Sequence, residues 1–364
     1  IFSGSSIGAQ FGYSVSSAGD VNGDGYDDII IGSPNEDLNS GKATLIFGNP
    51  SMSTYSILII DNPTAWYDDY FAFSVTGGGD VNGDGYADVV ISAPYDDLYG
   101  LDIGVAYVFY GGSSMNAIPD VTLAPALNIS SGEYGQSVSF AGDVNGDGFA
   151  DVLVMAPGDG SVFLYLGGTN MNNAYDLIYS GAYADGAGDV NGDGYSDVVF
   201  GGNGEVYICF GGAVPDNNPD ITFTGETSFD SFGNSVAGAG DINGDGFDDV
   251  IIGAFTNDAG GTDAGRAYVY FGGDQMDNFK DALLTGAAAG DWFGFSVSSA
   301  GDVNGDGYAD IIVGAPRNDT NGSNAGRAYI YTNTLTGRDI PDEFFTGEAE
   351  GNGFGYAVSG AGDV

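Results

Sequence analysis

One nine-residue string recurs along the chain, and its side chains could hold a metal ion. Its first copy reads Asp20-Val21-Asn22-Gly23-Asp24-Gly25-Tyr26-Asp27-Asp28, with oxygen-bearing side chains at positions 1, 3, 5 and 9 and glycine at position 6. Alternate side chains of a tight loop can point to one centre, glycine permits the sharp turn, and the carbonyl at position 7 can add an oxygen. Hard oxygen ligands suit Ca²⁺, whereas Mg²⁺ demands a smaller, nearly octahedral shell. The string therefore predicts a calcium loop.

Six complete copies of this loop are present, 46 to 63 residues apart, and a seventh begins at Asp363. Metal-free Asx turns are the alternative, but three carboxylates in one short loop would repel each other without a cation. No Glu stands at position 12 as in an EF-hand, because an apolar run has begun there, so each loop should join two strands. Position 9 is expected to close each site. We expect about six Ca²⁺ sites, with the position 7 residue contributing its carbonyl: Asp20, Asn22, Asp24, Tyr26, Asp28; Asp80, Asn82, Asp84, Tyr86, Asp88; Asp143, Asn145, Asp147, Phe149, Asp151; Asp189, Asn191, Asp193, Tyr195, Asp197; Asp241, Asn243, Asp245, Phe247, Asp249; Asp302, Asn304, Asp306, Tyr308, Asp310.

The charge balance and the missing residue types disfavour several classes of function. The 364 residues include 51 acidic and 6 basic ones, for a formal net charge of −45. Such a surface repels nucleic acid and anionic membranes, and no apolar stretch is long enough for membrane insertion. Histidine, the commonest general base, is absent, and the single cysteine, Cys209, lies in an apolar run that predicts a buried side chain.

Each loop has the same neighbours, which predict four short strands per repeat. An alternating segment precedes the loop, a β-branched run follows it, and two further segments, such as 266–272 and 220–225, complete the unit. No stretch shows helical periodicity. A lone four-stranded sheet cannot bury both faces, but stacking the copies around a ring can do so. We therefore expect an all-β, seven-bladed β-propeller of four-stranded antiparallel blades.

Phe293-Gly294 precedes one predicted calcium loop and Gly314-Ala315-Pro316 follows it. On these residues the repeats resemble the FG-GAP repeat, which forms the propeller of integrin alpha subunits. The GAP element appears as Gly314-Ala315-Pro316, and in altered form in other repeats, while the fourth repeat is shorter and reads Gly201-Gly202-Asn203. The resemblance covers nearly the whole chain and implies one propeller domain over residues 1–364. The FG pair is kept at four places and altered at Phe71-Ala72 and Tyr134-Gly135: Phe11-Gly12, Phe232-Gly233, Phe293-Gly294 and Phe354-Gly355.

The resemblance also implies which loops meet a partner. In the family the calcium loops lie on the lower face and other loops form the upper face, which here would comprise residues 35–40, 95–103, 257–265 and 317–325. The connections that hold Trp66 and Trp292 would lie there too. An exposed Trp favours a contact role; the alternative is that each Trp packs between blades.

The ends of the chain predict an incomplete seventh blade. By the phase of the repeat, Ile1-Phe2-Ser3 is a last strand and residues 354–362 are a first strand, with the two middle strands missing. Either the natural protein continues, or a neighbouring chain completes the blade by strand complementation.

Three classes of function remain open. The first is a non-catalytic extracellular, cell-surface module that binds a protein or glycan through the upper-face loops. The second is a structural subunit of an extracellular filament or matrix, self-assembled by blade complementation. The third is a calcium-dependent polysaccharide-active enzyme, which the convergence of Arg317, Arg338 or Lys280 with a Tyr would favour; we expect no enzyme. Short sequons at Asn128, Asn318 and Asn321 would permit glycosylation of a secreted protein.

Overall fold

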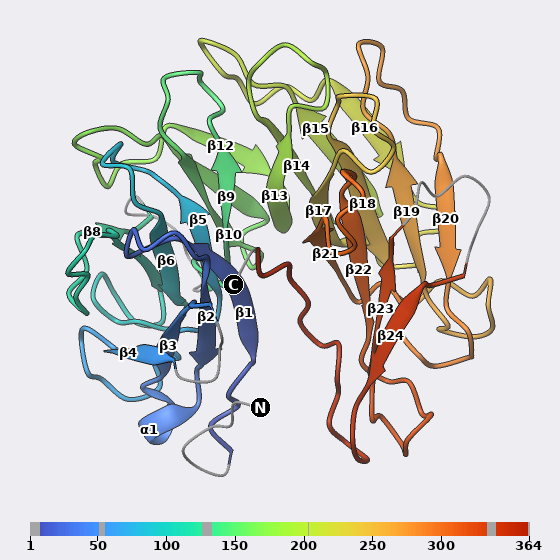
Figure 1. The fold of residues 1–364 in the computed structure, drawn as a ribbon, viewed down its shortest axis with the longest axis horizontal. Helices are drawn as coiled ribbons and strands as arrows, with labels where there is room; N and C mark the ends of the chain where they lie inside the picture. Colours follow the sequence, from blue (N-terminus) through green and yellow to red (C-terminus); the bar gives the residue numbers. More distant parts are fainter. Residues whose placement is uncertain (1–7, 51–54, 126–132, 203, 333–339, 363–364) are drawn as a thin grey trace. The chain divides into compact units, whose positions relative to one another are not determined.

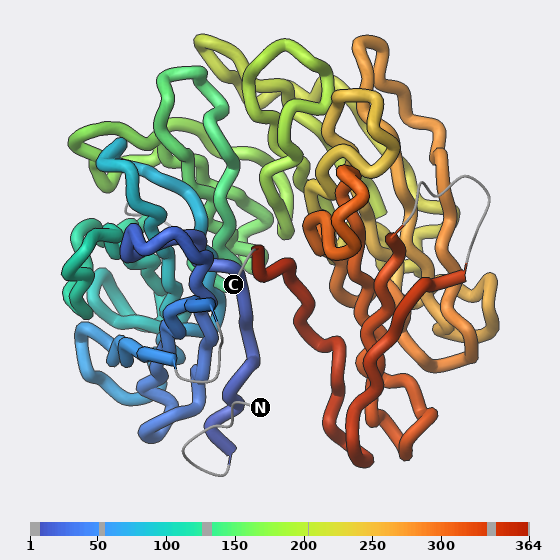
Figure 2. The backbone as a smooth tube through the Cα atoms, viewed as in Figure 1, coloured from blue at the N-terminus to red at the C-terminus, as the bar shows by residue number. Residues whose placement is uncertain are grey.

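The computed structural model describes residues 8–50, 55–125, 133–202, 204–332 and 340–362. In these residues, 24 strands form six four-stranded sheets, and within every sheet consecutive strands pair antiparallel (Figure 1). Each sheet is one continuous stretch of chain, so the colour of the backbone changes sheet by sheet (Figure 2). The fold is an all-β propeller of four-stranded blades, as expected.

The chain divides into two compact units. The first contains three blades, with these strands: β1 Ser14–Gly19, β2 Asp28–Ser33, β3 Lys42–Phe47, β4 Ser56–Asp61; β5 Val75–Gly79, β6 Asp88–Ala93, β7 Val105–Phe109, β8 Val121–Leu123; β9 Ser137–Gly142, β10 Asp151–Ala156, β11 Ser161–Tyr165, β12 Leu177–Ser180.

The second unit contains the other three blades of the described chain. Their strands are as follows: β13 Tyr183–Gly188, β14 Asp197–Gly202, β15 Glu205–Cys209, β16 Ile221–Thr224; β17 Phe232–Gly240, β18 Asp249–Ala254, β19 Arg266–Tyr270, β20 Ala282–Thr285; β21 Ser296–Gly301, β22 Asp310–Ala315, β23 Arg327–Tyr331, β24 Glu343–Thr346.

The composition of each strand follows from its place in the blade. First strands are rich in Ser, Ala and Gly because they approach the first strand of the next blade: a Cβ on Gly77 of β5 would come within 2.5 Å of Ala18 in β1. Second strands are β-branched and covered on both faces, so β6, β10 and β18 are buried at every residue. Cys209, at the end of β15, is buried as expected.

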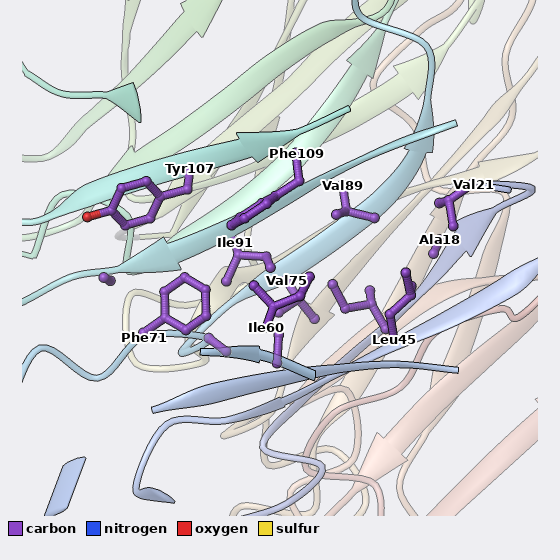
Figure 3. Close-up of a cluster of buried hydrophobic side chains, with 14 of the residues drawn as sticks. Ala18, Val21, Leu45, Ile60, Phe71, Val75, Val89, Ile91, Tyr107 and Phe109 are labelled. Atoms are coloured by element: carbon purple, nitrogen blue, oxygen red, sulfur yellow. The ribbon is translucent and has the colours of Figure 1, made fainter. Parts of the chain in front are cut away.

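Apolar side chains pack between consecutive blades and form the core. Between the first two blades, Leu45 and Ile60 meet Phe71, Tyr107 and Phe109, all of them at most 2% exposed (Figure 3). Equivalent clusters lie between the second and third blades, the fourth and fifth, and the fifth and sixth. Burial of both faces therefore depends on a neighbouring blade.

One short turn departs from the all-β expectation. The segment α1, Glu36–Asn39, is a single turn whose backbone is left-handed at Asp37 (φ 49°) and Leu38 (φ 62°). Among the described residues, no helix is long or apolar enough to cross a membrane.

The prediction of seven blades with an incomplete seventh is wrong: the described residues form six. Residues 354–362 begin as other first strands do, because Phe354 forms a parallel bridge with Gly326 just as Phe71 does with Gly41. Gly360 N also donates to Ser299 O at 3.1 Å. No described strand pairs with the other edge of this segment, and a strand exists only where neighbouring backbone groups pair. Residues 1–3 and 363 lie outside the described residues.

Candidate functional site

Each repeated loop joins the first strand of a blade to the second, as the motif predicts. A register shift just before the loop, between Ser17 and Gly19 in the first blade, puts Gly19 opposite Asp28. The same shift occurs before the other five loops. Such a bulge bends the strand and redirects the chain, so every loop leaves its sheet in the same way.

The first Asp of the loop organises its backbone. In the fourth loop, Asp189 Oδ1 accepts hydrogen bonds from Gly192 N (2.7 Å) and Asp193 N (3.0 Å), and Oδ2 accepts one from Gly194 N (2.8 Å). Asp193 Oδ1 in turn accepts from Tyr195 N at 3.1 Å. The carboxylates at positions 1 and 5 therefore lie inside the turn that they shape.

The Asp at position 9 has a structural role that the sequence analysis missed. Asp197 is fully buried; its Oδ2 accepts from Val190 N (2.9 Å) and its Oδ1 from Gly211 N (2.8 Å). It thus ties the loop to the end of the third strand. The sequence signal for this role is a glycine shortly after the third strand. It is present in each of the five repeats in which its N–H donates to the position 9 Asp. In the sixth, Val303 N donates to Asp310, and the residue equivalent to Gly211 is residue 333, outside the described residues.

The donor set of each loop fits a hard cation. Burial, and to a lesser extent the charges of Asp24 and Asp20, raise the pKa of Asp28 to about 6. In the described part of the chain, no three acidic side chains gather into a group that could hold a metal ion. Each loop would therefore also need its Asn oxygen and its position 7 carbonyl. The thirty ligands predicted above remain a prediction.

The aromatic residue at position 7 links one loop to the next. A Cβ on Gly23, at position 4 of the first loop, would come within 2.5 Å of the ring of Tyr86. The same relation joins four further pairs of consecutive loops: Gly83 with Phe149, Gly146 with Tyr195, Gly192 with Phe247, and Gly244 with Tyr308. The residue whose carbonyl is a predicted ligand therefore also packs its ring on the neighbouring loop.

On the first unit, three connecting loops are hydrogen-bonded together: residues 35–40, 62–70 and 95–103, here termed the recognition loops. Tyr70 N donates to Asn39 O (2.9 Å), Asn39 Nδ2 to Asp68 Oδ1 (2.8 Å), and Tyr95 N to Asp69 O (3.4 Å). Two of these loops were predicted as partner-binding loops, and the third is the predicted connection that holds Trp66.

Large apolar side chains are exposed on these loops, and we term them the recognition patch. Trp66 is 49% exposed, so it does not pack between blades. The patch consists of six residues with exposures from 43% to 81%: Leu38, Trp66, Tyr67, Leu98, Tyr99 and Leu101.

Trp292, on the second unit, is only partly buried and lies in an aromatic cluster. Its ring stacks on Phe295 (centroids 5.8 Å apart, 10° between planes) and contacts Phe255 at 5.1 Å. The Arg317 guanidinium lies over the same ring at 3.2 Å.

The basic residues that would have favoured an enzyme have separate partners. Lys280 Nζ lies 2.7 Å from Glu226 Oε1 and 5.5 Å over the ring of Tyr268, whereas Arg317 lies over Trp292. Arg338 falls outside the described residues. Of the two described residues, Lys280 thus contacts a Tyr ring, whereas Arg317 contacts a Trp ring, and the two do not share a partner.

Asn318 cannot serve as a glycan acceptor in the folded chain. It is 4% exposed, and its Nδ2 donates to Asp291 Oδ2 at 2.7 Å. Asn321 is exposed, although its Nδ2 donates to Gly347 O at 3.0 Å, while Asn128 lies outside the described residues.

Comparison with known proteins supports the reading of the repeats. The family model described as FG-GAP repeat matches residues 11–46, 232–270 and 293–331. A second, described as FG-GAP-like repeat, matches residues 80–154.

Curated relatives include several integrin alpha subunits. Integrin alpha-5 of Xenopus laevis is 43% identical over 99 residues, which is 26% of this chain and 9% of that protein. Integrin alpha-PS5 of Drosophila melanogaster is 32% identical over 173 residues, covering 45% of this chain and 17% of that protein. Integrin alpha-6 of Gallus gallus is 37% identical over 146 residues, covering 39% and 13%. The matches thus span less than a fifth of each of these relatives.

A solved structure shares the fold at low sequence identity. The crystal structure of BBS1N in complex with ARL6DN, soaked with lead, aligns over 88% of this chain and 79% of that chain, with a TM-score of 0.51 and 11% identity. This likeness concerns the fold alone.

Proposed function

The chain belongs to the FG-GAP repeat family, and from that premise we propose that it is a non-catalytic, calcium-binding propeller that recognises a protein partner outside the cell. The exposed recognition patch on hydrogen-bonded loops is the observation that carries this proposal. Calcium would bind the loops that join the first and second strands of the blades and would stabilise them. We further propose that all six blades form one domain.

The patch has the composition of a contact surface. Tyr67 is 68% exposed and Leu101 is 81% exposed. Single exposed apolar residues are common, but several on loops that are hydrogen-bonded together are typical of a surface that another molecule covers, and Trp and Tyr are enriched among residues that dominate binding energies.

The loops beneath the patch are shaped before any partner arrives. Left-handed backbone at Leu38 (φ 62°), Ala65 (φ 53°) and Tyr70 (φ 54°) is sustained by the hydrogen bonds between the loops. A preformed surface loses less conformational entropy on binding than a mobile one does.

The charges around the patch indicate the chemistry of the partner. Asp68, Asp97 and Asp102 are exposed on the same loops. The cation Lys42 nearby lies 2.8 Å from Asp37, which is also exposed. A protein surface that combines basic and apolar side chains would be complementary.

The test is peptide selection on the calcium-loaded protein, followed by affinity measurements. We expect the selected peptides to be rich in Lys, Arg and apolar residues, and to lose affinity about tenfold or more in a Trp66→Ala, Tyr67→Ala variant. Phe229→Ala is the matched control, since Phe229 is 87% exposed on the second unit. Equal loss in both variants, or none in either, would refute the assignment. Selection of glycans in a parallel array would change the class of partner.

A second candidate function, assembly through the last blade, is favoured by one observation. Phe345 of β24 is 54% exposed and Phe354 is 42% exposed, whereas Phe223 and Phe293, at the same places in other repeats, are 0% and 1% exposed. A further blade, from the same polypeptide or from another copy, would cover them. Sedimentation of the wild type and a Phe345→Ser variant tests this: particles that shrink in the variant support assembly between copies, and a monomer in both rules it out.

A further inference from the structure

Two blades of the second unit share a buried Asp–Asn pair behind their connecting loops. Asn257 Nδ2 donates to Asp230 Oδ2 at 2.8 Å, and Asn318 Nδ2 donates to Asp291 Oδ2 at 2.7 Å. All four residues are at most 5% exposed. An amide donor thus satisfies a buried carboxylate at the same place in both blades.

In the second blade, an acid replaces this asparagine. Asp96 stands at the position of Asn257, and its Oδ1 accepts from Leu98 N (2.7 Å) as Asn257 Oδ1 accepts from Ala259 N (3.0 Å). The hydroxyl of Tyr107, at the place of Tyr268, donates to Asp96 Oδ2 at 3.0 Å. The geometry of the site is kept, but the amide donor is lost.

The carboxylate that the asparagine would bind is also kept in the second blade, so this blade buries two acidic side chains. Asp69 takes the place of Asp230, and Asp69 and Asp96 are 1% and 0% exposed. The Thr64 hydroxyl lies 2.7 Å from Asp69 Oδ2 and 3.2 Å from Asp96 Oδ2. Because a hydroxyl has one proton, it cannot donate to both carboxylates.

A compensating donor accompanies the exchange. Asn62 Nδ2 donates to Asp69 Oδ2 at 2.7 Å, at a place where the other two blades have Gly225 and Gly286. The charged groups that act on Asp69 are Asp96 and Asp97 from the next loop. Asp96 and Asp69 also raise the pKa of the Tyr107 hydroxyl. Burial, followed by the charges of Asp96 and Asp97, raises the pKa of Asp69.

We propose that the buried pair of Asp69 and Asp96 takes up and shares one proton as pH falls, and that this proton locks together the loops of residues 62–70 and 95–103. The proton comes from solvent and forms a carboxyl O–H that donates to the other carboxylate, replacing the amide of Asn257. These loops carry Trp66, Tyr67, Leu98 and Tyr99, so the recognition patch becomes more ordered as pH falls. This last consequence rests on the proposed function; the shared proton does not.

The sign of the effect on stability follows from the raised pKa of Asp69. The folded state holds the proton more tightly than the unfolded state does, so the contribution of the pair is fully present at low pH. It is lost as pH rises from the ordinary Asp range through the raised pKa of the folded state.

The experiment is urea unfolding of the calcium-loaded full chain from pH 4.5 to 7.5, for the wild type and three variants. Asp96→Asn restores the amide, and we expect its unfolding midpoint to exceed that of the wild type at pH 7.5, by a margin that shrinks as pH falls. Asn257→Asp creates the acid pair in the fifth blade and should lower the midpoint at pH 7.5 only. Asp69→Asn is a second way to remove the pair, should Asp96→Asn not fold.

Parallel curves for the wild type and the Asn variants would overturn the proposal, as would an Asn257→Asp variant that lacks the added pH dependence. Trp66 fluorescence in a Trp292→Phe background reports on the patch. We expect Trp66 fluorescence to change with pH when Asp69 and Asp96 are both present, and not to change when Asp96→Asn is added. Fluorescence that does not change with pH in the first case would overturn the link between the shared proton and the recognition patch. These measurements use no binding partner. Their outcome is therefore independent of the peptide-binding test of the proposed function, which uses the Trp66→Ala, Tyr67→Ala variant.

Discussion

The ring of Phe247 lies against the backbone of Gly192, one loop back along the chain. A Cβ at residue 192 would come within 2.4 Å of ring atom Cε1 of Phe247, and the backbone there has φ +78°. Phe247 is also the residue whose carbonyl is a predicted calcium ligand in the fifth loop. Through this contact, the position of one loop depends on the position of the next.

Gly192→Ala is therefore expected to destabilise the protein more than Gly194→Ala. Both glycines have positive φ, but nothing lies within 4 Å of a Cβ on Gly194. The conformational cost is about 1–2 kcal/mol in each, and the clash with Phe247 adds roughly 1–3 kcal/mol at residue 192 alone. Denaturant unfolding in calcium measures the difference, and equal losses would show that the contact is unimportant.

Removal of calcium should lower the melting temperature strongly. At a hundredfold excess over its dissociation constant, one bound ion adds about 2.7 kcal/mol to the free energy of unfolding, and six loops are predicted to bind. Melting curves with calcium and with a chelator provide the measurement. An unchanged melting temperature would contradict the assignment of the loops.

A single ligand can be tested with a nearly isosteric change. Asp245→Asn keeps an acceptor for Phe247 N, which now donates to Asp245 Oδ1 at 3.1 Å, but removes the charge. We expect calorimetric titration to show about one fewer calcium ion per chain, and the melting temperature to fall only when calcium is present. Asp274→Asn, at an exposed acid outside the loops, should change neither quantity.

The ion pairs of Glu226 predict a second pH dependence, opposite in sign to that of the acid pair. A hydrogen bond from Lys280 (2.7 Å), and then the charge of Arg266 (2.9 Å), lower the pKa of Glu226. A lowered pKa in the folded state adds stability above the ordinary Glu range, and this is lost as pH falls through the lowered pKa. The wild type should therefore exceed Glu226→Gln in stability at neutral pH, by an amount that shrinks in acid. The exposed Glu350→Gln serves as control, and a pH-independent difference would contradict the prediction.

Glycosylation should avoid Asn318. Its amide is buried and donates to Asp291, so after secretion from a eukaryotic host we expect peptide mass spectrometry to find residue 318 unmodified. Asn318→Ala should cost about 1–3 kcal/mol, because the buried carboxylate of Asp291 then loses one of its hydrogen-bond donors. Asn321→Ala, at an exposed neighbour, should cost less. A glycan at 318 on folded protein would contradict the structure.

Much of the fold could be predicted from periodic residues alone. The spacing of the loops and the β-branched runs, such as that of β18, predicted four strands per repeat, because strand formation follows local patterns of apolar residues and turns. The same strings placed each loop between a first and a second strand. The number of blades could not be obtained in this way, because residues 354–362 have the pattern of a strand but lack a described partner on one edge.

The roles of individual acidic residues could not be predicted from local sequence patterns. By itself the sequence determined the repeat, the oxygen-bearing residue types at positions 1, 3, 5 and 9, and the acidic charge, since each depends only on residue identity and spacing. Only the tertiary structure decided that Asp197 also ties its loop to Gly211 N, that Asn318 is buried against Asp291, and that Asp69 and Asp96 both lie beside the Thr64 hydroxyl. Asp69 and Asp96 lie 27 residues apart in a chain rich in acids, and their meeting depends on how the loops between strands fold back on one another, which no short-range pattern encodes.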